Sequence, residues 1–352
     1  MKAKNKIAAL MMVLSLTLFF FQCSKDPQIP SPQVTGVTFT VPQGWPQPVY
    51  NFEENTLTDA GFNLGRRLFY EKKLSRDGSI SCGSCHQQFA AFANAAHARS
   101  HGVDGQFGKR NAPALFNLNW QTSFMWDGGI NHITVQPLAP INDSLEMDGN
   151  MNDVIAFLSA DASYRKMFKE TFGDEAVTTQ RVLKSFAQFL GALVSSNSKY
   201  DRIQRGEAGY AFTADEEIGK SIFNQRCASC HAPPLFSNFS YRNIGLEPNV
   251  SLQDSGRMRI SESVQDMHSY KMPSLRNVEV SSPYMHDGRF KTLDKAIDYH
   301  INKPYYMSNV DPVILNGQAL SVDEIQSIIS FLNTLTDNTF IHDTRFSDPL
   351  YK

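Results

Sequence analysis

The chain has 352 residues, and its 33 lysines and arginines nearly balance its 35 aspartates and glutamates, for a formal net charge of −2. This balance does not favour nucleic acid or an anionic membrane surface as a partner. The length exceeds that of one typical hydrophobic core and therefore predicts two domains. Beyond the N-terminal segment, no apolar stretch is long enough to predict a membrane-spanning helix.

The N-terminal segment, residues 1–23, is typical of a targeting signal. Three lysines among its first six residues precede an apolar stretch, residues 8–22, that is too short to span a bilayer and ends at Cys23. A cysteine in this place resembles the lipid-attachment site of a bacterial lipoprotein. We therefore predict a periplasmic or cell-envelope protein that contacts the membrane only through a lipid anchor on Cys23. A cleaved secretory signal is the alternative.

Residues 24–50 carry six prolines and predict an extended tether. After it, the pattern favours helices joined by long loops. Thr58 can cap a helix whose apolar face includes Phe62 and Phe69. Apolar residues at helical spacing predict another helix over residues 178–197. The predicted fold class is mainly α.

A polar stretch over residues 198–212 predicts a domain boundary. We expect an N-terminal domain over residues 51–200 and a C-terminal domain over residues 201–345.

Two capping boxes predict helix starts in the second half. Thr213 pairs with Glu216, and Ser321 pairs with Glu324, each before apolar residues at helical spacing.

A further helix is predicted to begin at Thr292, with an apolar face that ends in a histidine. Leu293, Ala296, Ile297 and His300 share one face at helical spacing, so the imidazole is expected to point toward the core.

Two copies of one pentapeptide carry the chemistry, CGSCH at residues 82–86 and CASCH at residues 227–231. The spacing C-x-x-C-H is the attachment signature of c-type haem. The two thiols bind the haem vinyl groups, and the histidine ligates the iron. A redox dithiol needs no following histidine, and a zinc site needs four ligands in one cluster. The predicted ligands of two covalent haems are Cys82, Cys85, His86, Cys227, Cys230 and His231.

A short repeat precedes each haem motif. GRRLF at residues 65–69 comes before CGSCH, and GKSIF at residues 219–223 comes before CASCH. In both places a short helix is expected to lead into the haem turn. The repeat predicts two cytochrome c-like haem domains with long loops, related by a diverged internal duplication.

From Gly65 to about Leu335, the chain resembles the bacterial diheme cytochrome c peroxidase family, which includes the diheme enzyme of methylamine utilisation. The shared motifs are, in order, LFYEKKLSRDGSISCGSCH, HGVDGQFGKRNAPALFN, WDGG, LEM, CASCH, MPSLRNV, PYMHDGRFKTL and FLNTLT. The resemblance implies a peroxidase that reduces hydrogen peroxide to water. A small cytochrome c or copper protein would supply the electrons. The family is commonly dimeric, which leaves a homodimer open.

The resemblance implies that the chemistry takes place at the first haem. Glu146 in LEM is then the acid/base that moves a proton between the peroxide oxygens. Gln136 helps to position peroxide, and Trp126 in WDGG carries electrons between the haems. His101 is the candidate distal ligand that blocks the iron until the second haem is reduced. His97 is its competitor, and a solvent-facing histidine without a ligand role is the remaining alternative.

The second haem, with His231 as proximal ligand, is expected to store or pass electrons. In the family its sixth ligand is a methionine or a tyrosine, but the corresponding position here is His300. A histidine lowers the potential relative to methionine. Tyr299, Met285 and Met307 are the alternatives.

The resemblance also implies a calcium ion between the domains. Asn111, Ser281 and Pro283 match the family's ligand positions, and amide and carbonyl oxygens suit calcium. Two other functions stay open at this point. One is a diheme oxidase that acts on a protein or organic substrate, and the other is a non-catalytic electron-transfer cytochrome.

Overall fold

The computed structural model describes residues 33–95 and 97–349, which belong to one compact unit. The predicted signal at residues 1–23 and the first part of the tether lie outside the described residues. Within the described part of the chain, no helix is long and apolar enough to cross a membrane.

The predicted helical fold class is confirmed, with long loops and short 3-10 turns between the helices. In the first half the helices are α2 (Asp59–Tyr70), α3 (Cys82–Cys85), α4 (Leu138–Asn142), α5 (Met151–Ala160), α6 (Ala162–Phe172) and α7 (Thr179–Ala192). In the second half they are α8 (Lys199–Gln204), α9 (Ala214–Arg226), α10 (Met258–Ser261), α11 (Leu293–Asn302), α12 (Pro312–Leu315), α13 (Val322–Asn333) and α14 (Asn338–Ile341). Two short strands, β1 (Tyr241–Arg242) and β2 (Tyr270–Lys271), pair antiparallel.

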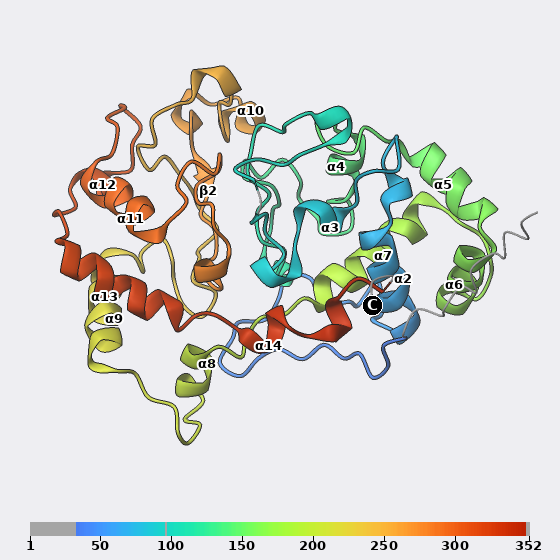
Figure 1. Ribbon diagram of the computed structural model, residues 1–352, viewed down its shortest axis with the longest axis horizontal. Helices are drawn as coiled ribbons and strands as arrows, with labels where there is room; N and C mark the ends of the chain where they lie inside the picture. The colour runs from blue at the N-terminus through green and yellow to red at the C-terminus, as the bar shows by residue number, and fades with distance from the viewer. Residues whose placement is uncertain (1–32, 96, 350–352) are drawn as a thin grey trace, which may run out of the picture. The chain divides into compact units, whose positions relative to one another are not determined.

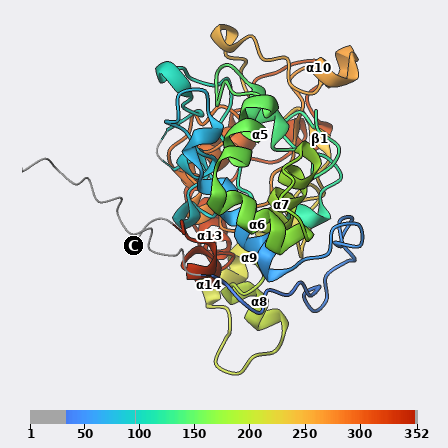
Figure 2. The ribbon, with the colours of Figure 1, turned by 90° about the vertical axis from the view of Figure 1, so that its right-hand side faces the viewer.

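The first hydrophobic core forms where α2 packs on α7. Thr58 caps α2 as predicted, because its hydroxyl accepts a hydrogen bond from the Gly61 amide at 3.0 Å. Gly65 lets the two helices approach closely, since a Cβ at this position would collide with the carbonyl of Ser185. On the outer side, α6 packs on α2 and α5 packs on α6 (Figure 2).

The second hydrophobic core forms where α9 packs on α13. Both helices begin at the predicted capping boxes. Gly219 allows these two helices to approach closely, since a Cβ at this position would collide with the carbonyl of Ser327. Ile218 is 54% exposed although it is apolar. The reason is geometrical: the buried stripe runs through Gly219 and Phe223, and Ile218 is rotated by about 100° from it.

The segment after α13 returns to the first core. Phe340 and Ile341 of α14 belong to the first core together with Phe346, whose ring packs on Phe62 of α2, while the Phe340 ring packs on Phe92. The Tyr70 hydroxyl donates to the Phe346 carbonyl at 2.8 Å, which holds this segment on α2. Figure 1 shows α14 leaving the end of α13 and reaching the side of α2 and α7.

Residues from both halves of the chain meet in an ionic cluster around the buried Asp127 side chain. The Asp127 side chain is fully buried and pairs with Arg110 at 2.7 Å and with Arg259 at 2.6 Å. Arg110 also pairs with Asp254 at 2.6 Å. These pairs join segments that lie far apart in sequence, and the predicted domain boundary between them stays a prediction.

Candidate haem sites

The two C-x-x-C-H motifs fold into similar turns. In the first, α3 spans Cys82–Cys85, and the His86 amide donates to the Cys82 carbonyl at 2.9 Å. In the second, the turn follows α9, and the His231 amide donates to the Cys227 carbonyl at 2.9 Å. The four cysteines of these motifs are not joined in disulfides. Each turn therefore presents two thiols and an imidazole together.

Backbone carbonyls orient both histidines. Nδ1 of His86 donates to the Phe92 carbonyl at 2.8 Å, and Nδ1 of His231 donates to the Pro273 carbonyl at 3.1 Å. A carbonyl only accepts, so Nδ1 carries the proton and Nε2 keeps its lone pair for a metal. Burial lowers the pKa of both histidines to about 4, which favours the neutral, ligating form. This donor set fits covalent haem at each turn.

A cavity of about 400 Å³, called here the first cavity, lies against His86. It adjoins a smaller one of about 50 Å³ that Cys82 and Cys85 line. His86, Gln136 and Glu146 line both cavities. The structure thus brings together the predicted proximal ligand and the two predicted peroxide-facing residues.

Glu146 is held by the loop that carries His101. The Ser100 hydroxyl donates to Oε1 of Glu146 at 3.1 Å, and the Val103 amide donates to the Glu146 carbonyl at 2.9 Å. Burial raises the pKa of the Glu146 carboxyl, and the nearby Asp143 carboxylate raises it further, while the Ser100 hydrogen bond lowers it. Sequence reasoning missed Ser100, because no local pattern marks a hydroxyl whose partner is 46 positions away.

His101 lines the smaller cavity together with His86 and Glu146, whereas His97 is not among its lining residues. The His101 ring stacks on Phe107, with 4.9 Å between the ring centroids. Its carbonyl lies 3.8 Å from the Cys85 sulfur. The loop therefore passes directly over the first haem turn, and iron ligation by His101 stays a prediction.

Trp126 lines both the first cavity and the cavity at the second haem turn. Its indole nitrogen donates to the Asn111 carbonyl at 2.9 Å, and its own carbonyl accepts from the Lys271 amide at 2.7 Å. These bonds fix the ring in the wall shared by the two cavities. The role of Trp126 as an electron bridge stays a prediction.

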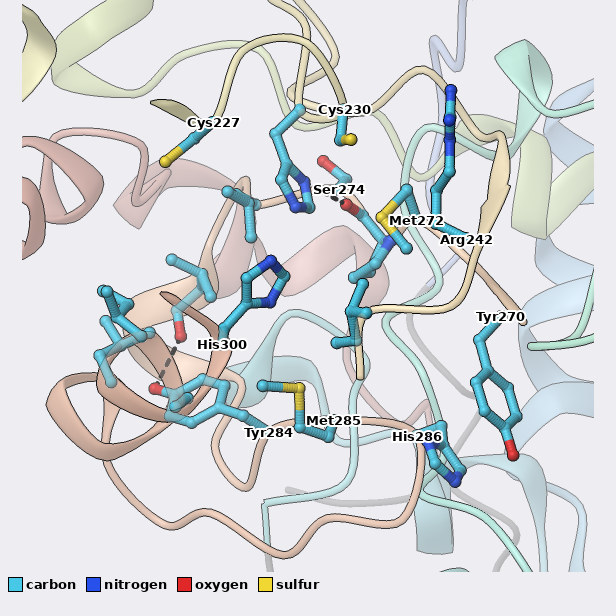
Figure 3. Close-up of a pocket in the computed structure, with 18 of the residues that line it drawn as sticks. Cys227, Cys230, Arg242, Tyr270, Met272, Ser274, Tyr284, Met285, His286 and His300 are labelled. Atoms are coloured by element: carbon cyan, nitrogen blue, oxygen red, sulfur yellow. Dashed lines mark hydrogen bonds between the residues drawn. The ribbon is translucent and has the colours of Figure 1, made fainter. Parts of the chain in front are cut away.

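The second cavity, of about 220 Å³, lies against Cys227, Cys230 and His231. One face of α11 forms part of its wall, through the predicted stripe Leu293, Ala296, Ile297 and His300 and through Ile301. Figure 3 shows the imidazole of His300 projecting into the cavity on the side of Cys227 and Cys230, with Met285 and Tyr284 below it. Burial lowers the pKa of His300 to about 4, with a smaller contribution from His231.

The alternatives to His300 fall into two groups. Met285 also lines the second cavity. Tyr299 is turned elsewhere, since its hydroxyl accepts from the Glu247 amide at 3.1 Å and its ring packs on Phe290. Met307 is outside the cavity lining, with its sulfur 3.9 Å from Nδ2 of Asn243. The structure thus brings His300 and Met285 to the cavity and leaves Tyr299 and Met307 out.

The three predicted calcium ligands, Asn111, Ser281 and Pro283, also line the second cavity. The Asn111 amide donates to the His286 carbonyl at 2.7 Å, and its side-chain Nδ2 donates to the Ala98 carbonyl at 3.0 Å. The first of these bonds links the two loops from which the predicted ligands come. The ion itself stays a prediction.

Known proteins resemble this chain over most of its length. Residues 59–209 match the family model described as di-haem cytochrome c peroxidase. Methylamine utilization protein MauG of Methylorubrum extorquens is 32% identical over 306 residues, covering 84% of this chain and 83% of the relative. Cytochrome c551 peroxidase of Nitrosomonas europaea is 32% identical over 276 residues, covering 78% and 79%.

Solved structures agree with this assignment. The crystal structure of a MauG-like protein associated with microbial copper homeostasis superposes with a TM-score of 0.81 at 28% sequence identity. It covers 89% of this chain, which in turn spans 99% of that structure. The family model, the 32% identical relatives and this solved structure agree, and this chain belongs to the di-haem cytochrome c peroxidase family.

Proposed function

We propose that the chain reduces hydrogen peroxide to water with electrons from a small redox protein. The observation that carries this proposal is the shared cavity of His86, Gln136 and Glu146. A c-type haem attached at Cys82 and Cys85 would supply, when bound, the iron that binds peroxide and delivers electrons to its O–O bond. The overall reaction takes two electrons and two protons and yields two waters.

The protein's own part in this reaction is proton transfer by Glu146. Its carboxylate takes a proton from one peroxide oxygen and returns it to the oxygen that leaves as water. Burial raises the pKa of the Glu146 carboxyl, which makes its carboxylate a stronger base for the proton that peroxide gives up. Gln136 lines the same cavity and is the residue proposed to hold the peroxide by hydrogen bonds.

The second site is proposed to store and pass electrons. His231 and His300 are its proposed iron ligands, because both line the second cavity and burial keeps both imidazoles neutral. Electrons would arrive singly from a small cytochrome c or copper protein and pass near Trp126 to the first haem. His101 is the proposed distal ligand that gates the first iron.

Further features are proposed from the sequence and the family. A calcium ion would bind near Asn111, Ser281 and Pro283. An envelope location with a lipid anchor on Cys23, and a homodimer, are proposed on the same basis. A diverged duplication of the two haem lobes is supported by the matching contacts of Gly65 and Gly219, each against a serine carbonyl on the partner helix.

A diheme oxidase is the second candidate, because the relative named for methylamine utilization is as similar in sequence as the one named for peroxidase activity. The position of Tyr299 outside the second cavity argues against Tyr299 as the counterpart of the tyrosine ligand of the methylamine enzyme.

The test is Glu146→Gln in the haem-loaded protein, assayed for peroxide turnover with a reduced cytochrome. General acid/base groups contribute roughly 10²–10⁴-fold, so a loss of that size in kcat is expected while both haem spectra stay intact. Asp143→Asn is the matched control, because this exposed carboxylate lines the same cavity and should cost far less. Full activity in Glu146→Gln would overturn the proposed function.

A further inference from the structure

Lys271 is a buried cation that the proposed chemistry does not use. Its side chain comes from β2 in the second half of the chain and is only 9% exposed. Nζ donates to Oε1 of Gln121 at 2.6 Å and to the Ser123 carbonyl at 2.6 Å. Both acceptors are neutral, and no ion pair in the described part of the chain includes Lys271.

An ammonium has three N–H donors, so two neutral acceptors leave one donor without a partner and do not neutralise the positive charge. Isolated buried charges are costly, and native proteins pair them with an opposite charge. The carboxylates of the neighbouring ionic cluster already have partners of their own. Asp127 pairs with Arg110 and Arg259, and Asp254 pairs with Arg110.

The ammonium lies on the side of the first haem. Lys271 lines both cavities, but its acceptor Gln121 and the ring of Phe124, which lies 5.7 Å from Nζ, line only the first. Lys271 therefore reaches from the second half of the chain into the wall of the cavity that contains His86.

We propose that Lys271 binds a propionate carboxylate of the haem attached at Cys82 and Cys85. A carboxylate supplies the missing negative charge and an acceptor for the third N–H donor. A residue of the second half of the chain thereby fixes the first haem and sets its reduction potential. The inference rests on haem attachment at the first motif and is independent of peroxide turnover.

The burial of Lys271 agrees with such a partner. Desolvation lowers its pKa to about 7, and Asp127 only partly opposes this effect. A bound carboxylate would favour the charged form and hold the ammonium protonated at neutral pH.

The experiment is a redox titration of the holoprotein, followed by optical and electron paramagnetic resonance spectra that distinguish the two haems. Lys271→Gln keeps an N–H donor but removes the charge, so the first haem should become harder to reduce. We expect on the order of a tenfold change in its reduction equilibrium, about 59 mV for one electron. The second haem should keep its potential, and Lys271→Arg should stay close to the unaltered protein.

Lys109→Gln is the matched control, because Lys109 lines the same cavity but is exposed to solvent. Its charge is screened, so its loss should shift the potential much less. An unchanged first haem in Lys271→Gln, or an equal shift in Lys109→Gln, would overturn the proposal. Resonance Raman spectra of the unaltered holoprotein decide the case if Lys271→Gln does not take up haem. A propionate bending mode that moves in D₂O supports an N–H partner, and an unmoved mode contradicts it.

Discussion

The two haem cavities are built on the same supporting contacts, but different residues line them opposite the proximal histidine. In both, a glycine on the preceding helix meets a serine carbonyl on the partner helix, and a backbone carbonyl holds Nδ1 of the proximal histidine. In the first cavity the lining includes Glu146 and Gln136. In the second it includes an apolar helix face that ends in His300. The shared parts place a cofactor, and the facing residues decide what the cofactor does.

The largest expected effect comes from removing the residue that faces His231. His300→Met should raise the potential of the second haem, because methionine ligation favours the reduced iron more than histidine does. Axial ligands tune haem potentials over about 0.8 V, so a shift of tenths of a volt is expected. Redox titration with electron paramagnetic resonance measures it, and the signal of the first haem should not change.

Two neighbours of His300 serve as controls for this ligand. Tyr299→Phe should leave both spectra unchanged, because its hydroxyl bonds the Glu247 amide outside the cavity. Met285→Leu should also be silent if His300 is the ligand. If Met285→Leu alters the spectrum of the second haem and His300→Met does not, Met285 is the sixth ligand of that iron.

The next prediction tests whether the helix pairs α2–α7 and α9–α13 are packed in the same way. Gly65→Ala and Gly219→Ala each place a Cβ against a serine carbonyl, and overpacking of this kind costs about 1–3 kcal/mol. Similar losses in the free energy of unfolding are expected from the two variants, measured by denaturant titration of the holoprotein. Ser221→Ala on the exposed side of α9 should stay within about 0.5 kcal/mol. A loss confined to one glycine would show that the two helix pairs are packed differently.

The smallest effect concerns Ser100, which lines the smaller cavity at the first haem turn. Ser100→Ala removes a hydrogen bond to Glu146 worth about 1 kcal/mol, or roughly fivefold in kcat/KM. Because this bond lowers the Glu146 pKa, its loss should raise that pKa. The base must be ionised, so the acid limb of the kcat/KM profile should move to higher pH. Ser100→Thr should restore the profile, and an unmoved limb in Ser100→Ala would exclude this positioning role.

Features with local causes could be predicted from the sequence. The caps at Thr58, Thr213 and Ser321 depend on residues within one helical turn, and all three begin helices as predicted. The stripe that ends at His300 follows from helical periodicity, and it lines the second cavity. The fold class and the haem turns follow from the same kind of short-range pattern.

Features with distant causes could not be predicted. Lys271 and Gln121 are 150 positions apart, and no periodicity or spacing connects them. Ser100 reaches Glu146 across a loop whose path depends on the packing of the whole first cavity. Sequence patterns find residues that carry chemistry, whereas their supporting contacts depend on tertiary structure.

The return of the C-terminal segment has a consequence for the order of folding. Phe340, Ile341 and Phe346 belong to the first core, although α9 and α13 of the second core precede them in the chain. During synthesis the N-terminal half therefore emerges with one side of its core uncovered. That half can reach its final packing only after residue 346 has been made, so the earlier haem motif lies in the part of the protein that is completed last.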